Sequence, residues 1–290
     1  MGVVRLPYLF RGFRSPALAA IGVLTILPYI HAVSAQELPK VASINVCTDQ
    51  LVLNLADPSQ ILSVSWLAAD PEESMFAEQA SHYPLNYGTA EEILRLKPDI
   101  VIGGRFTSQY TRQLLAELGY PVIDIAPALT LLDVEQNLRK VAVAIGRESQ
   151  AEKLIARMRV SVHTLETTRP AATPEAVVLR AGGFTVGAET LAHQLMWLAG
   201  LRNLAAEKGL DRWGSLSMET LLLSRPDLIV FMGYRSNDMS LANAIFQHPA
   251  LAKLSGTVDT VTVPSKYWSC GLPESLVSAE LLRSAVESWQ

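Results

Sequence analysis

The chain has 290 residues, a formal net charge of −4 and two cysteines. Beyond the N-terminal segment no lysines or arginines cluster, so the chain lacks the basic surface by which proteins bind nucleic acid. Its length suits either one large domain or two of modest size, each able to bury a core of its own.

Residues 1–35 have the pattern of a secretory signal peptide. Three arginines precede an apolar stretch from Ala17 to about Ile30, and residues 33–35 supply the small side chains that a signal peptidase requires. The apolar stretch is shorter than the ~20 residues that span a bilayer comfortably, and Cys47 lacks the preceding small residue of a lipidation site. We therefore expect an exported, soluble protein without a lipid anchor, whose mature chain begins near Gln36.

Residues 36–128 are expected to form an α/β lobe in which strands alternate with helices. Apolar runs bounded by loops predict the strands, and the leucines that follow Asp49 predict the first helix. Gly119 is expected to end a further helix that begins near Ser108, because glycine readily takes the left-handed conformation that closes a helix. The expected strands are residues 41–44, 61–65, 100–102 and 121–125.

Residues 129–169 are expected to connect the two lobes. Apolar positions recur at helical spacing from Leu131 to about Thr167 without a proline, which predicts a long helix. Gly146 marks the point at which a kink would fall. Arg169-Pro170 ends the run, so the helix should act as one stiff connector.

Residues 170–290 are expected to form a second α/β lobe. A strand at 176–179 leads into a glycine-rich turn at 182–184, and a helix at 190–199 is closed by Gly200. Two further apolar runs predict additional strands, and a helix is expected to close the chain. These last elements are residues 228–231, 258–263 and 274–289.

One phrase occurs twice, at residues 91–101 and 219–229, displaced by 128 residues. Each copy begins with a glutamate, continues with leucine or isoleucine at helical spacing, and ends in Pro-Asp and an apolar run. Because proline cannot continue a helix, the phrase predicts a helix, a turn and a buried strand. Such uninterrupted apolar strands are typical of a parallel sheet covered on both faces. The repeat therefore predicts two similarly built lobes.

Aromatic and basic residues follow several of the predicted strands. In open parallel sheets ligands bind beyond the carboxyl ends of the strands, where aromatic rings supply flat apolar walls and arginines pair with carboxylates or phosphates. Packing of the aromatic rings in the core, and solvation of the arginines, are equally consistent with the sequence. The candidate ligand-binding residues are Asn45, Cys47, Trp66, Arg105, Phe184, Trp213, Tyr234, Arg235, Tyr267, Trp268 and Cys270.

No catalytic motif stands out. The histidines lie scattered, without the spacing of a metal site or a proton relay, so we expect no catalytic residue, no metal ligands and no intrinsic cofactor. Cys47 and Cys270 are the only cysteines. A disulfide between the lobes, a pair of free thiols, contact with a ligand and simple packing all remain open for them.

Glu91 and Glu219 lead the two copies of the repeat. Either one alone is explained as an acid that complements the positive end of a helix dipole. Matched acids on two lobes would also suit a partner that has twofold symmetry and basic sockets.

Several segments together resemble the periplasmic substrate-binding proteins of ABC importers for iron chelates and vitamin B12. The resemblance implies two Rossmann-like α/β lobes with mostly parallel sheets, joined by a single long connecting helix. It also implies a monomer that delivers a metal chelate to a dimeric ABC permease in the inner membrane, with Glu91 and Glu219 docking on permease arginines. It rests on residues 41–43, 90–102, 119–122, the long helix, 213–219 and 248–251.

The resemblance implies a cobalt- or iron-containing chelate as ligand, with cobalamin slightly ahead of a ferric siderophore or haem. Cobalamin binders of the family use an aromatic cleft, ferric-siderophore binders add arginines, and haem binders offer a tyrosine or histidine. The chain has candidates for each: Trp66, Trp213 and Trp268 for the first, Arg105 and Arg235 for the second, Tyr234 or Tyr267 for the third.

Two alternatives remain. A free metal-ion binder of related fold would need three or four converging ligands, and the predicted cleft has too few histidines. A secreted α/β enzyme would need a nucleophile beside a base, and Cys47 has no histidine near it in the sequence.

Overall fold

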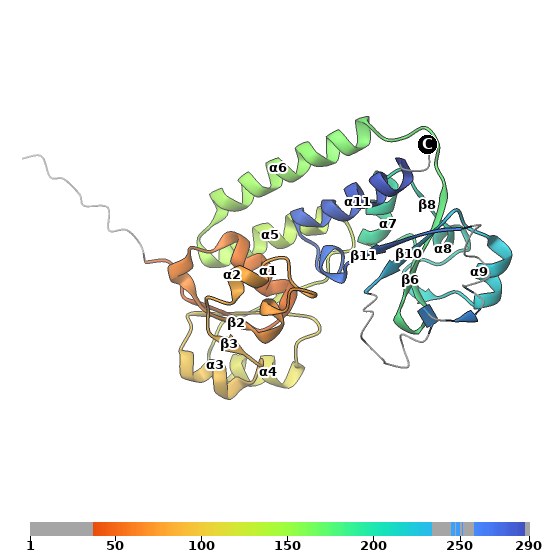
Figure 1. Ribbon diagram of the computed structural model, residues 1–290. Coiled ribbons are helices and arrows are strands. Elements are labelled where there is room, and N and C mark those ends of the chain that lie inside the picture. The colour runs from red at the N-terminus through yellow and green to blue at the C-terminus, as the bar shows by residue number, and fades with distance from the viewer. Residues whose placement is uncertain (1–36, 234–244, 247, 250, 252–257, 288–290) are drawn as a thin grey trace, which may run out of the picture. The chain divides into compact units, whose positions relative to one another are not determined.

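The computed structural model describes residues 37–233, 245–246, 248–249, 251 and 258–287 (Figure 1). The predicted signal peptide, Tyr234 and Arg235 lie outside the described residues. From Leu38 onward the chain forms one compact unit. None of the described helices combines the length and the apolar character needed to cross a bilayer.

The first sheet has five parallel strands in the order β3-β2-β1-β4-β5. The four predicted strands are confirmed, and β3 is an addition that only two residues form, too short to stand out as an apolar run. The strands are β1 (Val41–Ser43), β2 (Ile61–Ser65), β3 (Leu85–Asn86), β4 (Ile100–Gly104) and β5 (Val122–Ile125). The helices are α1 (Val46–Leu55), α2 (Ala77–Ala80), α3 (Ala90–Leu96) and α4 (Gln109–Glu117).

The predicted long helix is divided into α5 (Leu131–Ile145) and α6 (Glu148–Thr167). Gly146 lies between them in the left-handed conformation, with φ of 69°, which ends α5 as glycine commonly does. The expectation of one continuous helix is therefore corrected, and the break falls at the glycine where a kink was expected. The α6 helix packs against α5 and also against α7 and α11 of the second lobe.

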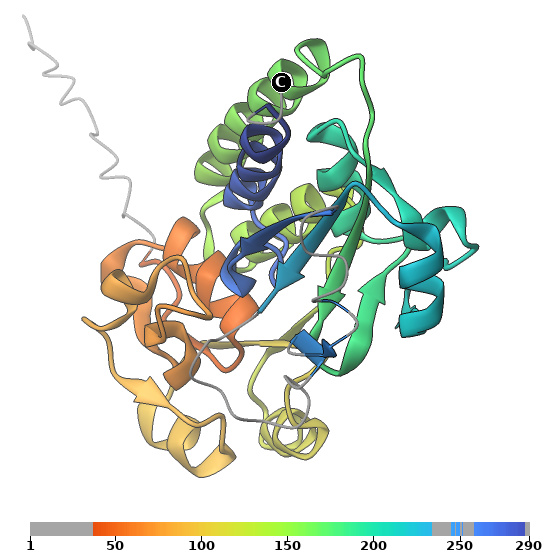
Figure 2. The same ribbon diagram turned by 45° about the vertical axis from the view of Figure 1, so that its right-hand side comes forward.

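The second lobe contains a four-stranded parallel sheet in the order β11-β10-β6-β8 and an antiparallel pair, β7 with β9. Figure 2 shows α11 beside α6 from a second direction. The strands are β6 (Glu175–Arg180), β7 (Phe184–Val186), β8 (Arg202–Asn203), β9 (Trp213–Ser215), β10 (Leu228–Met232) and β11 (Asp259–Val263). The helices are α7 (Leu191–Leu198), α8 (Leu204–Glu207), α9 (Met218–Ser224) and α11 (Leu276–Glu287).

Each sheet takes its strands from one predicted lobe, whereas the core does not divide in the same way. A single cluster of buried side chains includes residues of both sheets and of the helices between them, such as Val41, Leu138, Val178 and Leu282. The lobes therefore share an apolar core beside the connecting helices. The lobe boundaries at residues 128 and 170 stay a prediction.

The internal repeat has the same local structure in both copies. Thr89 caps the start of α3 and Ser217 caps the start of α9, each by accepting a backbone N–H with its hydroxyl oxygen. Both helices end on a left-handed residue, Lys97 at φ 50° and Arg225 at φ 45°, and these are the two non-glycine residues with positive φ in the described chain. The prediction of two similarly built lobes is confirmed at this level.

The aspartate of each Pro-Asp pair anchors the start of a neighbouring strand. Asp99 accepts the backbone N–H of Lys40 at 2.7 Å, just before β1. Asp227 accepts the backbone N–H of Glu175, the first residue of β6, also at 2.7 Å. The repeated aspartates are thus explained by strand placement, and not by a ligand.

Candidate functional site

A cavity of about 380 Å³ lies at the carboxyl ends of strands from both sheets. Its walls come from the residues that follow β1, β4 and β5 in the first lobe, and from the ends of β6 and β10 and the segment after β11 in the second. This is the position predicted for a ligand. Of the candidate residues, the structure brings six to this cavity: Asn45, Cys47, Arg105, Trp213, Trp268 and Cys270.

Asn45 faces the cavity from the start of α1, where it also caps the helix. Its Oδ1 accepts the backbone N–H of Cys47 at 3.1 Å. Gly104, at the end of β4, passes so close that a Cβ there would lie 3.0 Å from this oxygen. The glycine therefore lets β4 end directly against the capped helix.

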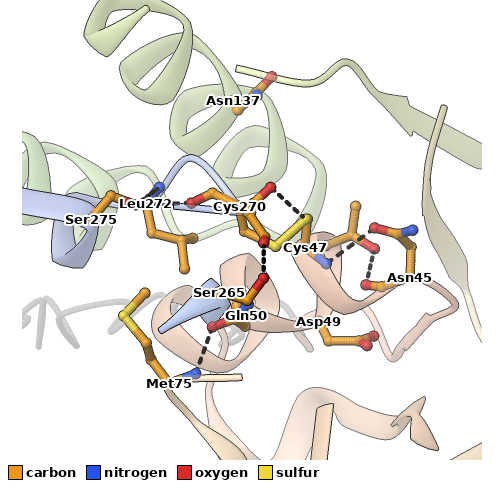
Figure 3. The surroundings of a disulfide bond; sticks show 12 residues. Asn45, Cys47, Asp49, Gln50, Met75, Asn137, Ser265, Cys270, Leu272 and Ser275 are labelled. Carbon is orange, nitrogen blue, oxygen red and sulfur yellow. Dashed lines mark hydrogen bonds between the residues drawn. A yellow bond between two sulfur atoms is a disulfide. The ribbon is translucent and has the colours of Figure 1, made fainter. Parts of the chain in front are cut away.

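Cys47 and Cys270 form a disulfide with a Cα–Cα distance of 5.0 Å, across 223 residues of sequence (Figure 3). Of the four states left open for these cysteines, the structure therefore has the bridge. Both cysteines line the cavity. Because neither sulfur is a thiol, Cys47 cannot serve as the nucleophile of the enzyme alternative.

Further contacts tie the lobes together beside the disulfide. The side-chain amide of Asn54 in α1 donates to Glu274 at 2.9 Å, and Lys266 donates to the backbone oxygen of Pro71 at 3.0 Å. Ser275 stabilises the turn after the bridge, since its hydroxyl donates to the Cys270 carbonyl at 2.8 Å (Figure 3). This side of the cleft is closed by covalent and polar links.

Two tryptophans form apolar walls of the cavity. Trp268 is buried, and its indole Nε1 has no hydrogen-bond partner within the described part of the chain. Trp213 is half exposed and also lines a second chamber of about 320 Å³. Phe184 lies in that second chamber only.

The structure does not bring Trp66 or Tyr267 into either chamber. Trp66 follows β2, toward the edge of the first sheet, and its exposed ring stacks on Tyr87 with centroids 6.3 Å apart. Tyr267 packs against the core and lies under the ammonium group of Lys266. Position after a strand therefore did not by itself place a side chain in the cavity, since Trp268, the residue after Tyr267, does line it.

Arg180 is a cavity residue that the sequence analysis did not select. It is the last residue of β6 and lines both chambers. Burial lowers the pKa of its guanidinium, opposed by the negative charge of Glu73, and an arginine with so high an initial pKa stays protonated. The sequence does indicate this residue, because Arg180 is a polar residue at the end of a buried strand, and ligands bind beyond such strand ends.

Asp49 is a second residue that the sequence analysis passed over. It is fully buried in α1, accepts a hydrogen bond from the hydroxyl of Ser65, and has one carboxyl oxygen without a partner among the described residues. Burial raises its pKa to about 6. Asp49 does not line the cavity, so its contact ties α1 to the end of β2 and does not serve a ligand directly.

Glu91 and Glu219 occupy matching places, exposed in the first turns of α3 and α9. This position fits both readings of the pair, complement of a helix dipole and contact with a partner. The docking role stays a prediction.

The described residues include no group of three or more histidine, cysteine, aspartate or glutamate side chains placed to hold a metal ion. His193 does not line the cavity; its Nδ1 lies 3.4 Å from the side-chain amide of Asn203, and burial lowers its pKa. The free-metal alternative thus has no site in this part of the chain.

Comparison with known proteins adds relatives of similar length. A family model described as periplasmic binding protein matches residues 41–258. The chain is 24% identical over 265 residues to a vitamin B12-binding protein of Photorhabdus laumondii, covering 90% of this chain and 92% of that protein. It is 28% identical over 235 residues to one of Pectobacterium atrosepticum, covering 78% and 80%.

Solved structures share the fold. The periplasmic haem-binding protein HutB of Vibrio cholerae matches with a TM-score of 0.72 at 21% identity, covering 85% of this chain and 98% of that chain. The periplasmic vitamin B12-binding protein BtuF of the same organism matches with a TM-score of 0.64 at 17% identity, covering 87% and 97%. The predicted fold class is therefore confirmed.

Proposed function

Because the chain belongs to the periplasmic binding protein family, we propose that it captures a metal chelate between its two lobes and delivers it to an ABC permease in the inner membrane. Membership of a family of binding proteins also confirms the expectation of binding and not catalysis. One observation supports the proposal above all: a cavity lined from both lobes at the strand ends, with tryptophan walls.

The described lining of the cavity favours a chelate whose metal is already fully coordinated. It includes no histidine, tyrosine, aspartate or glutamate, and its two cysteines are bridged. Such walls offer no strong ligand to an exposed iron or to a free metal ion. They suit cobalamin and a hexadentate ferric siderophore, whose metals bring their own ligands, ahead of haem, and the tryptophan walls place cobalamin slightly ahead of the siderophore.

A corrinoid is larger than the inner chamber, so it would also fill the second chamber and extend beyond both. Trp213 and Arg180 line both chambers, which allows one bulky ligand to contact them together. The protein itself would work as a monomer in the periplasm, exported by the predicted signal peptide, without an intrinsic cofactor.

The first experiment is a fluorescence titration of the protein purified from the periplasm of an expressing bacterium. The ligands are cyanocobalamin, haemin, a ferric hydroxamate and a ferric catecholate, and equilibrium dialysis excludes inner-filter artefacts. We expect saturable binding of cyanocobalamin, with a Kd of micromolar or below.

Two results would contradict this proposal. If folded protein binds none of the four chelates, chelate capture is wrong. If it instead binds free zinc, manganese or iron ions in the same assay, the free-metal alternative replaces it. Binding of haemin or a siderophore in preference to cyanocobalamin keeps the class of function and changes the ligand.

A further inference from the structure

The second chamber is lined by two polar side chains, Arg180 and Thr185, that make no side-chain hydrogen bond to the described residues. It has a volume of about 320 Å³, and Arg180, Trp213 and Met232 line it together with the inner chamber. Its remaining described walls include Phe184, Thr185 and Ser265, and no acidic side chain. It is thus an extension of the ligand cavity with its own chemistry.

The backbone of Arg180 is fixed by the sheet, while its side chain makes no contact of the hydrogen-bond or ion-pair kind within the described part of the chain. In the register of the sheet Arg180 lies opposite Met232 of β10, and the adjoining turn needs two glycines with positive φ, Gly182 and Gly183. Among the described residues its guanidinium makes no hydrogen bond or ion pair. Glu73 of the first lobe attracts it only at longer range. A partly buried cation without a partner carries a desolvation cost that an anionic ligand would offset.

Thr185 gives a second and independent observation. Its side chain is 1% exposed, it lines the same chamber, and its Oγ1 has no hydrogen-bond partner among the described residues. Trp268, which lines the inner chamber, is also buried, and its indole N–H likewise has no hydrogen-bond partner among the described residues. Buried polar atoms nearly always have partners in folded proteins, so unpaired donors on one continuous cavity point to a ligand that accepts hydrogen bonds.

We infer that Arg180 and Thr185 form a subsite for an anionic group of the chelate, a carboxylate or a phosphate, at the junction of the two chambers. The guanidinium supplies charge and two parallel N–H donors, and the threonine hydroxyl supplies a third. The chelate body would then lie against Trp213, with an acceptor near the indole N–H of Trp268. This inference rests on the proposed function, since it specifies the charge of the ligand that the same cavity takes.

The test compares ligands that differ in anionic charge. The pairs are cyanocobalamin and dicyanocobinamide, which lacks the phosphate; haemin and its dimethyl ester, which lacks the carboxylates; and ferric dicitrate and ferrichrome, which is neutral. Dissociation constants are measured by equilibrium dialysis for the wild-type protein, Arg180→Met, Thr185→Val and a control, Arg157→Met. Arg157 is exposed on α6, so its substitution removes the same charge away from the cavity.

We expect the wild-type protein to prefer the anionic member of whichever pair it binds. Arg180→Met should raise the Kd of that member by about tenfold or more, as expected for loss of a charge-assisted hydrogen bond, and leave the other member within about twofold. Thr185→Val, which keeps the shape, should raise the same Kd by about threefold or more. Arg157→Met should change neither.

The outcomes separate this inference from the proposed function. If the chelates bind but Arg180→Met and Thr185→Val weaken both members of a pair equally, or neither, the anionic subsite is wrong and chelate capture stands. If the wild-type protein prefers the uncharged member of a pair, the anionic subsite is also wrong, and chelate capture still stands. If no chelate binds to folded wild-type protein, both proposals fail together. Circular dichroism of each variant shows that it is folded.

Discussion

At the scale of single residues, two half-exposed tryptophans, Trp66 and Trp213, provide a matched test of the cavity. Trp66 and Trp213 are 47% and 50% exposed, and only Trp213 lines the chambers. We expect Trp213→Ala to raise the Kd for the bound chelate by about tenfold, because a large aromatic contact is lost. Trp66→Ala should leave the Kd within about twofold. Equal effects of the two substitutions, measured by equilibrium dialysis, would remove Trp213 from the ligand contact.

Asp49 gives a prediction about pH. Its pKa is about 6 in the folded protein, against an ordinary value of 3.8, so folding favours its protonated form. The stability from this site is fully present below pH 3.8 and is lost as the pH rises through 6. The loss is at most about 3 kcal/mol, because each tenfold change in proton affinity corresponds to about 1.4 kcal/mol.

Urea denaturation at pH 4.5 and pH 7.5, for the wild type and Asp49→Asn, isolates this contribution. Other carboxyls with lowered pKa values, such as Glu135, change stability in the opposite sense in both proteins. We therefore expect the free energy of unfolding of Asp49→Asn relative to wild type to increase between the two pH values. A difference that does not change with pH would show that Asp49 is ionised in the folded state throughout this range.

At the scale of elements, a glycine ends α5, and a buried acid, Glu135, then holds α6 against it. Glu135 of α5 is 6% exposed. Its carboxylate accepts two hydrogen bonds from Arg159 of α6, both at 2.6 Å, and one from Arg139 at 3.2 Å. The arginines hold the pKa of Glu135 below its ordinary value. A bidentate pair of this kind fixes the two helices side by side.

We expect Glu135→Ala to lower the free energy of unfolding by about 1–2 kcal/mol, a discounted value because Arg159 is largely exposed. Glu152→Ala is the control, since Glu152 is an exposed acid that pairs with Arg139 at 2.7 Å, and it should leave the urea midpoint nearly unchanged. Urea midpoints measure both. If Glu135→Ala and Glu152→Ala lower the stability equally, the burial of Glu135 adds nothing to the strength of its ion pairs.

The elements also show what the sequence could and could not predict. Long apolar runs predicted strands such as β4 and β10, and Gly146 marked the helix break, because burial and backbone freedom are local properties. The two-residue strands β3 and β8 were missed, since their pairing depends on neighbours distant in sequence. Arg180 could have been selected by its place at the end of the buried strand β6, whereas its position on both chambers appears only when the two lobes are in place.

At the scale of the whole molecule, the disulfide limits how far the lobes can separate. It joins α1 to the segment before α11, across a loop of 223 residues, and both cysteines line the cavity. We expect Cys47→Ser/Cys270→Ser to lower the free energy of unfolding by about 2–4 kcal/mol. Ligand dissociation should become several-fold faster, since the cleft opens more readily.

Stopped-flow fluorescence measures the dissociation rate, and urea denaturation measures the stability. Wild-type protein treated with dithiothreitol provides a second route to the same open state without a substitution. If stability falls while dissociation is unchanged in both preparations, the bridge acts on folding alone and does not restrain the cleft.

The predicted docking on a permease would involve both lobes at once. Glu91 and Glu219 are exposed in the first turns of the repeated helices α3 and α9, so one acid of each lobe would meet one half of a dimeric permease. Exposed charges contribute little to stability. Glu91→Ala/Glu219→Ala should therefore keep the wild-type Kd for the chelate and reduce its uptake into cells by tenfold or more.

The matched control is Glu117→Ala/Glu280→Ala, which removes the same charge from exposed positions, one on α4 and one on α11. Its uptake should equal that of the wild type, because neither acid belongs to the repeat. Uptake is measured with labelled chelate in cells whose chromosomal copy carries the substitutions. Weaker binding by the purified Glu91→Ala/Glu219→Ala protein would assign these acids to the ligand, and equal uptake by both double variants would leave only their structural role at the helix starts.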